Sequence, residues 1–225
     1  MDWSPIWISM KTACMAIVFT FFLGIAVAQL VVRLKSERVK MVFDGILTLP
    51  MVLPPTVAGF FLLFIFGVKR PVGIFLAGLG IKIVFTWWAT VLAAVVIAFP
   101  LMYRSARGAF EQVDPNLIYA GRTLGMSEWR IFWSVTLPEA APGVLSGGIL
   151  AFARGLGEFG ATAMIAGNIA NKTRTLPLAI YSAVAGGNME EAYGYVGILV
   201  VFSFIIVILM NLIVLYGRKG KGGQS

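Results

Sequence analysis

Five long apolar runs alternate with shorter polar segments along this chain. The runs cover approximately residues 6–32, 43–67, 83–103, 143–169 and 192–216. As helices, all five are long enough to cross about 30 Å of hydrocarbon, which takes about 20 residues. A sixth apolar stretch, residues 72–81, is too short to span, and we interpret it as an interfacial segment. The pattern predicts an all-α integral membrane protein, with five transmembrane helices in one domain over residues 1–225.

The composition agrees with a membrane location. Hydrophobic residues make up 59% of the chain and charged residues 12%, with a mean hydropathy of +0.90. In soluble domains about a quarter of the residues are charged. The net charge of +8 does not indicate nucleic acid binding, because the basic residues lie at the ends of apolar runs, where they anchor loops. The N-terminus lacks a basic region and a cleavage site, so we expect the first span to be retained.

The basic residues also predict the orientation. Loops on the cytoplasmic side carry an excess of Lys and Arg. Eleven basic residues fall on one predicted side: Arg33, Lys35, Arg38, Lys40, Arg104, Arg107, Arg122, Arg130, Arg218, Lys219 and Lys221. Five fall on the other: Lys69, Arg70, Lys82, Lys172 and Arg174. We therefore expect a multi-pass protein of the cytoplasmic membrane, with its N-terminus outside and its C-terminus inside.

The long polar segment on the cytoplasmic side, approximately residues 104–142, contains a predicted short helix. Asp114 is a good N-cap, Pro115 suits the first helical position, and Gly125 can take the left-handed conformation that ends a helix. Ser127 then caps a second helical run to Val135. We expect Pro138 to stop that run.

The first of these helices carries a narrow apolar stripe with small residues at its centre. Leu117, Ala120, Gly121 and Leu124 recur at i, i+3, i+4 and i+7. Small residues let another protein approach the backbone closely, so the helix is a candidate for recognition in the groove of a partner. The alternative is an amphipathic helix that packs only on its own protein.

Two of the spans contain unusual residues. The second holds Pro54 and Pro55, which distort a helix, and irregular backbone within a membrane is tolerated only against protein or a water-filled cavity. The bend either lines a pathway or is a kink buried between helices. In the fourth, Arg154 and Glu158 lie four residues apart, and they either neutralise each other along the helix or shape a pathway.

Glycines in the fourth span predict close packing. Gly143 and Gly147 form a small-xxx-small pair that allows a neighbouring helix to approach. In the external loop that follows, a short apolar stretch, Leu176–Ala185, lies near Lys172 and Arg174. We expect this loop either to meet a partner outside or to be solvated and anchored at the interface.

Catalytic and metal-binding chemistry is not expected in this chain. It has no His, and its single Cys14 lies in an apolar run, which excludes an intrachain disulfide and a His/Cys metal site. The sequence has no P-loop and no G-x-S-x-G or H-E-x-x-H motif. We therefore predict a non-catalytic protein without cofactors.

Residues 119–138 resemble the signature cytoplasmic loop of ABC importer permeases, in which E-A-A, three residues and Gly precede a Leu-Pro. Here the pattern is Tyr119-Ala120-Gly121, then Gly125, and later Leu137-Pro138, so Tyr119 replaces the Glu and Gly121 the second Ala. FARGLGEFGATAMIAGNI in the fourth span, TRTLP after it and LPMVLPPTVAGFFLL in the second are similar to the permeases for molybdate, and to those for sulfate. The resemblance covers about residues 33–181.

The resemblance implies a type I ABC importer permease fold and several partners. These are a second copy of the chain, with the pathway at the homodimer interface, two cytoplasmic ATPase subunits that bind ATP and Mg²⁺, and an extracytoplasmic molybdate-binding protein. The residues expected to contact the ATPase are Asn116, Leu117, Tyr119, Ala120, Gly121, Arg122, Thr123, Leu124 and Gly125. Pathway candidates are Pro54, Pro55, Arg154 and Glu158, and candidates for docking the binding protein are Lys172 and Arg174.

Two functional alternatives stay open from the sequence. Within the permease class, sulfate, thiosulfate or tungstate could replace molybdate, because these oxyanions differ more in size than in charge. A different class, an ion-gradient transporter or channel, would need intramembrane acidic relays or inverted repeats. The sequence offers only Glu158 as a deep acid and no obvious repeat.

Overall fold

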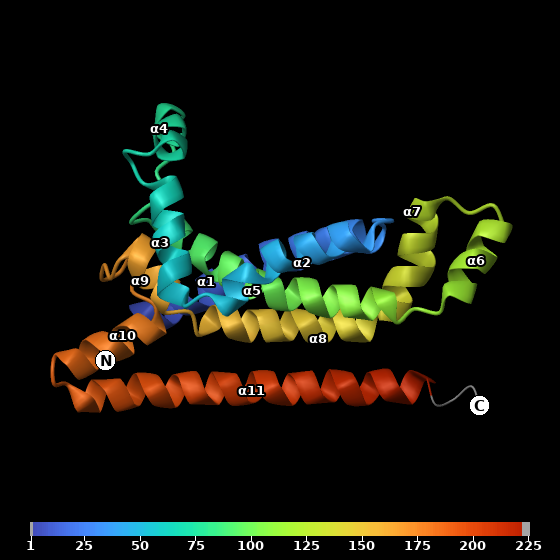
Figure 1. The fold of residues 1–225 in the computed structure, drawn as a ribbon. Helices are drawn as coiled ribbons and strands as arrows, with labels where there is room; N and C mark the ends of the chain where they lie inside the picture. Colours follow the sequence, from blue (N-terminus) through green and yellow to red (C-terminus); the bar gives the residue numbers. More distant parts are fainter. Residues whose placement is uncertain (1, 222–225) are drawn as a thin grey trace.

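The computed structural model describes the backbone of residues 2–221 and the side chains of residues 2–212, and within these residues all regular structure is helical (Figure 1). The predicted cytoplasmic residues Arg218, Lys219 and Lys221 lie outside the described side chains. The helices, with one π-helical turn labelled η1, are α1 (Ser4–Val32), α2 (Glu37–Val52), α3 (Pro55–Phe66), α4 (Pro71–Gly78), α5 (Trp87–Glu111), α6 (Pro115–Thr123), α7 (Glu128–Ile131), η1 (Phe132–Thr136), α8 (Leu137–Leu156), α9 (Gly160–Ala166), α10 (Leu176–Ala185) and α11 (Met189–Lys221).

The centre of the fold is the packing of α1, α5 and α8. Their shared core is rich in alanine, with Met102, Tyr103 and Phe110 of α5 filling the larger spaces. Small residues let helices approach closely where lipid supplies no hydrophobic drive for association. In Figure 1, α8 lies alongside α5, and α11 runs along the other side of α8.

The predicted small-xxx-small pair is confirmed. A Cβ on Gly143 would stand 2.8 Å from the Cβ of Ala109, and one on Gly147 would stand 2.4 Å from the Cβ of Ser105. Both neighbours belong to α5, so these glycines set how closely α8 and α5 pack. A side chain at residue 147 would push the two helices apart.

Four helices in the described part of the chain are long and apolar enough to cross a membrane: Ser4–Val32, Trp87–Glu111, Glu128–Leu156 and Met189–Leu212. The second predicted span, residues 43–67, is not one straight helix. It is the pair α2 and α3, bent by 109°, and only if this pair counts as one span does the number reach five. The bend lies at Leu53 and Pro54, both extended with ψ near 140°, as expected for residues that precede prolines.

The prediction that Pro138 stops a helix is wrong. Residues 128–156 form one continuous helix through α7, η1 and α8. A proline inside an α-helix removes a hydrogen bond and clashes with the carbonyl four residues earlier. The π-helical turn that ends two residues before Pro138 widens the helix there and accommodates the ring.

The bounds of two predicted spans and of the polar segment between them also need correction. The predicted fourth span, residues 143–169, begins earlier and ends at Leu156, and after a break at residues 157–159 the short α9 follows. Two glycines near its end, Gly155 and Gly157, favour that break because glycine is a poor helix former. The third span begins at Trp87 and extends as helix to Glu111, so the polar segment predicted over residues 104–142 is shorter than expected.

The hairpin of α6 and α7 projects from one end of the bundle, the end that also holds the start of α2 and the C-terminal end of α11 (Figure 1). The N-terminus, α4 and α10 lie at the opposite end. The short apolar stretches near residues 72–81 and 176–185 form α4 and α10, of eight and ten residues, neither long enough to span.

Candidate functional site

The first predicted helix of the polar segment is confirmed as α6. Asp114 is its N-cap, and the side chain accepts a hydrogen bond from the backbone N–H of Asn116 at 2.9 Å. At the other end Gly125 has a φ of +73°. The N–H of Met126 bonds the carbonyl of Gly121 at 3.1 Å and the N–H of Gly125 bonds that of Arg122 at 3.0 Å, which is the Schellman arrangement. Local signals alone therefore determine where this helix begins and ends.

The small-residue stripe of α6 does not lie wholly on one exposed face. Gly121 is buried against Ile131 of α7, whose Cγ1 would be 3.1 Å from a Cβ on residue 121. The expectation that Gly121 contacts a partner directly is therefore not supported by its position, because its own chain covers it. Leu117, Ala120 and Leu124 remain exposed, with Leu124 at 80%.

The hairpin is held by an ion pair as well as by this packing. Arg122 of α6 donates from Nε and Nη2 to the two carboxylate oxygens of Glu128, at 2.7 and 3.2 Å. These hydrogen bonds raise the pKa of Arg122 above its usual value. Ser127 caps α7, as predicted, by accepting from the N–H of Arg130. The hairpin therefore has a defined shape, with Tyr119 and Trp129 among its exposed side chains.

The two broken spans meet at the opposite end of the bundle. Gly59 of α3 lies so close to α9 that its Cβ would be 2.6 Å from the Cα of Ala161, and a Cβ on Gly160 would meet Pro55 and Thr56 at about 3.1 Å. Figure 1 shows α3 and α9 in contact there. The structure thus brings the predicted Pro54–Pro55 bend next to the break after Leu156. Sequence spacing alone did not predict this meeting.

Arg154 and Glu158 pair, but not along one helix. Arg154 is in the last turn of α8, and Glu158 lies beyond its end, in the break before α9. The Arg154 Nη1 is 2.8 Å from the Glu158 Oε2, while Oε1 accepts from the N–H of Ala161 at 2.8 Å. Glu158 is only 2% exposed and Arg154 about a third. Glu158 therefore joins the end of α8 to the start of α9, which corrects the expectation of an i, i+4 pair within a continuous span.

Lys172 and Arg174 lie in the loop before α10. Lys172 is exposed, whereas the Nε of Arg174 donates to the side-chain oxygen of Asn168 at 2.9 Å. Arg174 also lines a cavity of about 180 Å³ with Asp2 and Glu191. Two hydrogen bonds from Ser4 are the main reason that the pKa of Asp2 is lowered, and Arg174 adds to the effect. Arg174 is thus partly engaged by its own chain, and Lys172 is the freer of the two.

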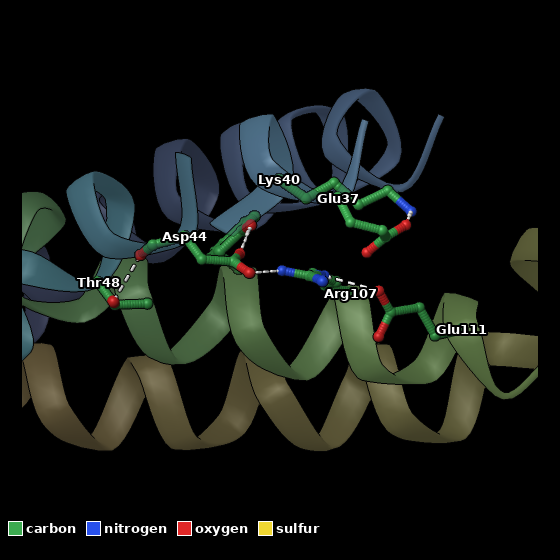
Figure 2. A network of polar contacts seen from close by, with 7 residues as sticks. Glu37, Lys40, Asp44, Thr48, Arg107 and Glu111 are labelled. Atoms are coloured by element: carbon green, nitrogen blue, oxygen red, sulfur yellow. Dashed lines mark hydrogen bonds and ion pairs between the residues drawn. The ribbon is translucent and has the colours of Figure 1, made fainter. Parts of the chain in front are cut away.

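A polar network between α2 and α5 was not found from the sequence. Asp44 of α2 accepts hydrogen bonds from the hydroxyl of Tyr103 and from Arg107, and Arg107 also donates to Glu111 at 2.8 Å (Figure 2). The sequence analysis gave Arg107 only an anchoring role. The available signal was a carboxylate, Asp44, inside an apolar run, where an ionisable group needs a partner.

The described residues contain no group of three His, Cys, Asp or Glu side chains placed to hold a metal ion. The geometry comprises an exposed hairpin at one end, two adjoining helix breaks at the other, and a bundle of long apolar helices between them. These features fit a helical membrane protein.

Comparisons with known proteins agree with this interpretation. The family described as "Binding-protein-dependent transport system inner membrane component" matches residues 20–219. The molybdenum transport system permease protein ModB of Escherichia coli (strain K12) is 40% identical over 211 residues, which cover 93% of this chain and 92% of that protein. ModB of Haemophilus influenzae is 39% identical over 94% of this chain and 92% of its own length.

Solved structures show the same fold. A chain of the inward-facing MetNI methionine ABC transporter superposes with a TM-score of 0.74, at 19% identity, over 95% of this chain and 94% of that one. A bacterial ABC transporter that imports alginate gives a TM-score of 0.71 at 15% identity, over 96% of this chain and 78% of that one.

Proposed function

This chain belongs to the family of binding-protein-dependent transport system inner membrane components, and from that membership we propose that it is the permease subunit of an ATP-driven importer for molybdate. The assignment of molybdate as the substrate rests on the 40% identity to a molybdenum transport permease over 93% of the chain. The permease fold, shared with the solved ABC transporters, supports the assignment to this class. Sulfate, thiosulfate and tungstate are the alternative cargoes.

The proposed assembly contains two copies of this chain, two ATPase subunits in the cytoplasm and a molybdate-binding protein outside. ATP and Mg²⁺ bind to the ATPase, since this chain carries no nucleotide-binding motif. The basic residues favour the orientation in which the α6–α7 hairpin faces the cytoplasm and the N-terminus lies outside. Lys172 and Arg174 then lie outside, where Lys172 is the better candidate to contact the binding protein.

The α6–α7 hairpin is the proposed contact with the ATPase. An amphipathic helix that presents an apolar face suits a groove on a partner. The exposed side chains of Leu117, Ala120 and Leu124 supply that face, and Tyr119 and Trp129 extend it. Gly121 and Gly125 contribute through shape, Gly121 by letting α7 approach and Gly125 by ending α6. Asn116, Arg122 and Thr123 complete the predicted set, with Arg122 bound to Glu128.

The proposed pathway passes the two adjoining breaks. Broken helices in a membrane occur where the backbone lines protein or water, and they allow segments to move relative to each other. Pro54 lies in one break, directly before Pro55 begins α3, and Glu158, paired with Arg154, occupies the other. Because Glu158 is buried and its charge is matched, it does not repel an oxyanion as a free carboxylate would. Movement at these breaks would alternate access to the two sides of the membrane.

The test is transport by the complete assembly in liposomes. We expect uptake of molybdate that requires the ATPase, ATP and the binding protein together. Competition by tungstate, sulfate and thiosulfate ranks the cargoes. Uptake that persists without the ATPase would contradict the proposal in favour of an ATP-independent transporter, and uptake of sulfate alone would replace molybdate as the cargo.

A further inference from the structure

The α2 helix depends on a polar network for its attachment to the rest of the protein. None of its residues is buried, and it lies mainly against α5, with little contact to α1 or α3. At its far end it stops at the Leu53–Pro54 break. Leu47 packs, partly buried, against the shared core. A helix with so little buried apolar surface gains little from packing, so the polar contacts to α5 contribute strongly to where it sits.

The partners of Asp44 on α5 are also held by other contacts. Tyr103 is fully buried and its hydroxyl donates to Asp44, and Glu111 holds the guanidinium of Arg107 from the other side (Figure 2). Tyr103, Arg107 and Glu111 are spaced four residues apart and therefore share one face of α5. Hydrogen bonds between charged groups are about twice as strong as neutral ones. The Asp44–Arg107 pair, strengthened by Tyr103, is thus the firmest contact between the two helices.

One side of this contact borders a cavity. A cavity of about 390 Å³ opens between α2 and α5, lined by Gly45, Thr48, Arg104 and Gly108 together with the network. A Cβ on Gly45 or Gly108 would meet nothing within 4 Å. The charges of the cavity balance, because two arginines face Asp44 and Glu111, so it does not favour an anion. Its importance is that Asp44 bridges it, through its contacts with Arg107 and Tyr103.

The network also lies next to the hairpin along the chain. Glu111 is the last residue of α5, and Asp114, three residues later, caps α6. A displacement of the hairpin therefore reaches the end of α5 that carries Arg107. The other end of α2 meets the break before α3. The α2 helix thus connects the hairpin end of the bundle with the proposed pathway.

We propose that the Asp44–Arg107 pair is a permanent tie that makes α2 follow α5 whenever the α6–α7 hairpin is displaced, so that ATPase motion reaches the α2/α3 break. The inference rests on the proposed function. The tie stays closed throughout the cycle and moves as a unit. Arg107 and Asp44 are positioning residues, since neither needs to touch the cargo.

The test replaces the ion pair by a removable covalent link. Asp44→Cys and Arg107→Cys are combined with Cys14→Ser, which removes the only native cysteine, and the assembly with ATPase and binding protein is placed in liposomes. Without a link we expect molybdate uptake per ATP hydrolysed to fall at least about tenfold, within the usual range of coupling free energies. Linking the two cysteines with a short bifunctional thiol reagent that has a reducible bridge should restore uptake per ATP, and reduction of the bridge should lower it again. The same folded sample is thus measured in the linked and in the unlinked state.

Two results would overturn the tie. One is full coupling in the unlinked double variant, and the other is loss of uptake on linking, which would mean that the pair must open. Arg104→Gln is the matched control, because Arg104 lines the same cavity and forms no ion pair among the described residues; it should keep coupling. The Cys14→Ser parent distinguishes failure of the proposed function from failure of the tie alone. If this parent hydrolyses ATP but imports no oxyanion, the proposed function is wrong, and the tie, which rests on it, is wrong as well.

Discussion

Gly121 of α6 lies directly against Ile131 of α7, and this contact sets the shape of the hairpin. A Cβ on residue 121 would also approach the Cδ1 of Ile131 to 3.3 Å. The side chain of Ile131 is buried, so it has little freedom to withdraw. The glycine is therefore needed inside the hairpin, where it lets the exposed residues of α6 and α7 form one surface.

Replacing Gly121 by valine should splay the hairpin. Inserting side-chain atoms into a packed contact costs about 1–3 kcal/mol, and we expect less ATPase to copurify with the variant. The matched control is Gly108→Ala, since a Cβ there meets nothing within 4 Å. Equal copurification of ATPase with Gly121→Val and with the parent would show that the contact does not determine the docking surface.

Replacing Gly125 by valine should uncouple ATP hydrolysis from uptake. The φ of +73° at this residue is strained for a β-branched side chain by about 1–2 kcal/mol, so the end of α6 should change conformation. Asparagine tolerates this conformation, and Gly125→Asn should keep most of the coupling. The measurement is the ratio of molybdate uptake to ATP hydrolysis, determined on the same liposomes. Normal coupled uptake by the valine variant would count against a docking role for this helix end.

A charge on the exposed face of α6 should weaken the ATPase contact without harming the permease. Leu124 is 80% exposed in the chain alone, and burying a leucine in an interface contributes about 1.5–3 kcal/mol. We therefore expect Leu124→Asp to lower the affinity for the ATPase at least about tenfold. Titration of the purified ATPase onto the permease measures this. Unchanged affinity would place the interface elsewhere, provided that the variant has the parent's thermal stability.

Removing Arg154 should destabilise the protein more than removing Glu158, although the two side chains form one ion pair. Arg154→Gln leaves a carboxylate that is 2% exposed with no cation, and breaking a buried pair in this way costs about 3–5 kcal/mol. Glu158→Gln leaves Arg154, which is a third exposed and can reach water, and its amide oxygen can still accept from Ala161, so a loss of about 1 kcal/mol is expected. Thermal unfolding of the purified protein should rank the two variants. Equal losses of stability in the two variants would mean that burial of the unpaired Glu158 carboxylate does not account for the destabilisation.

The contact between α3 and α9 should not tolerate even one added methyl group. A Cβ on Gly59 would lie 2.6 Å from the backbone of Ala161, so Gly59→Ala must shift one helix, at a cost of about 1–3 kcal/mol. We expect slower molybdate uptake with the hairpin and ATPase binding unaffected. Gly45→Ala on α2, where the same methyl group meets nothing, is the control. Uptake by Gly59→Ala at the parent's rate would argue that the α3–α9 contact can loosen freely.

Features determined by neighbouring residues could be predicted from the sequence. The ends of α6 follow from Asp114, Pro115 and Gly125, which act on the backbone beside them. The packing of Gly143 and Gly147 was likewise predictable, because the spacing alone puts both on one helix face. Local hydropathy found α1 and α11 for the same reason: lipid-facing helices are apolar nearly all round.

Features that depend on distant residues could not be predicted. Asp44 and Arg107 are 63 positions apart, and the residues around each of them do not indicate that the two side chains pair. Pro138 looked like a helix stop because its local effect is unfavourable, but the π-helical turn before it, stabilised within the packed bundle, relieves that effect. Gly121 seemed available to a partner until the fold of α7 over it was known.

The π-helical turn at residues 132–136 has one more consequence. Because it preserves helical continuity past Pro138, residues 128–156 form one continuous helix of 29 residues, although α7 turns away from the axis of α8 (Figure 1). One end of this helix carries Trp129 on the exposed hairpin, and the other ends just before the buried Glu158. The hairpin and the break at residues 157–159 are therefore joined by helical backbone alone, without a loop between them.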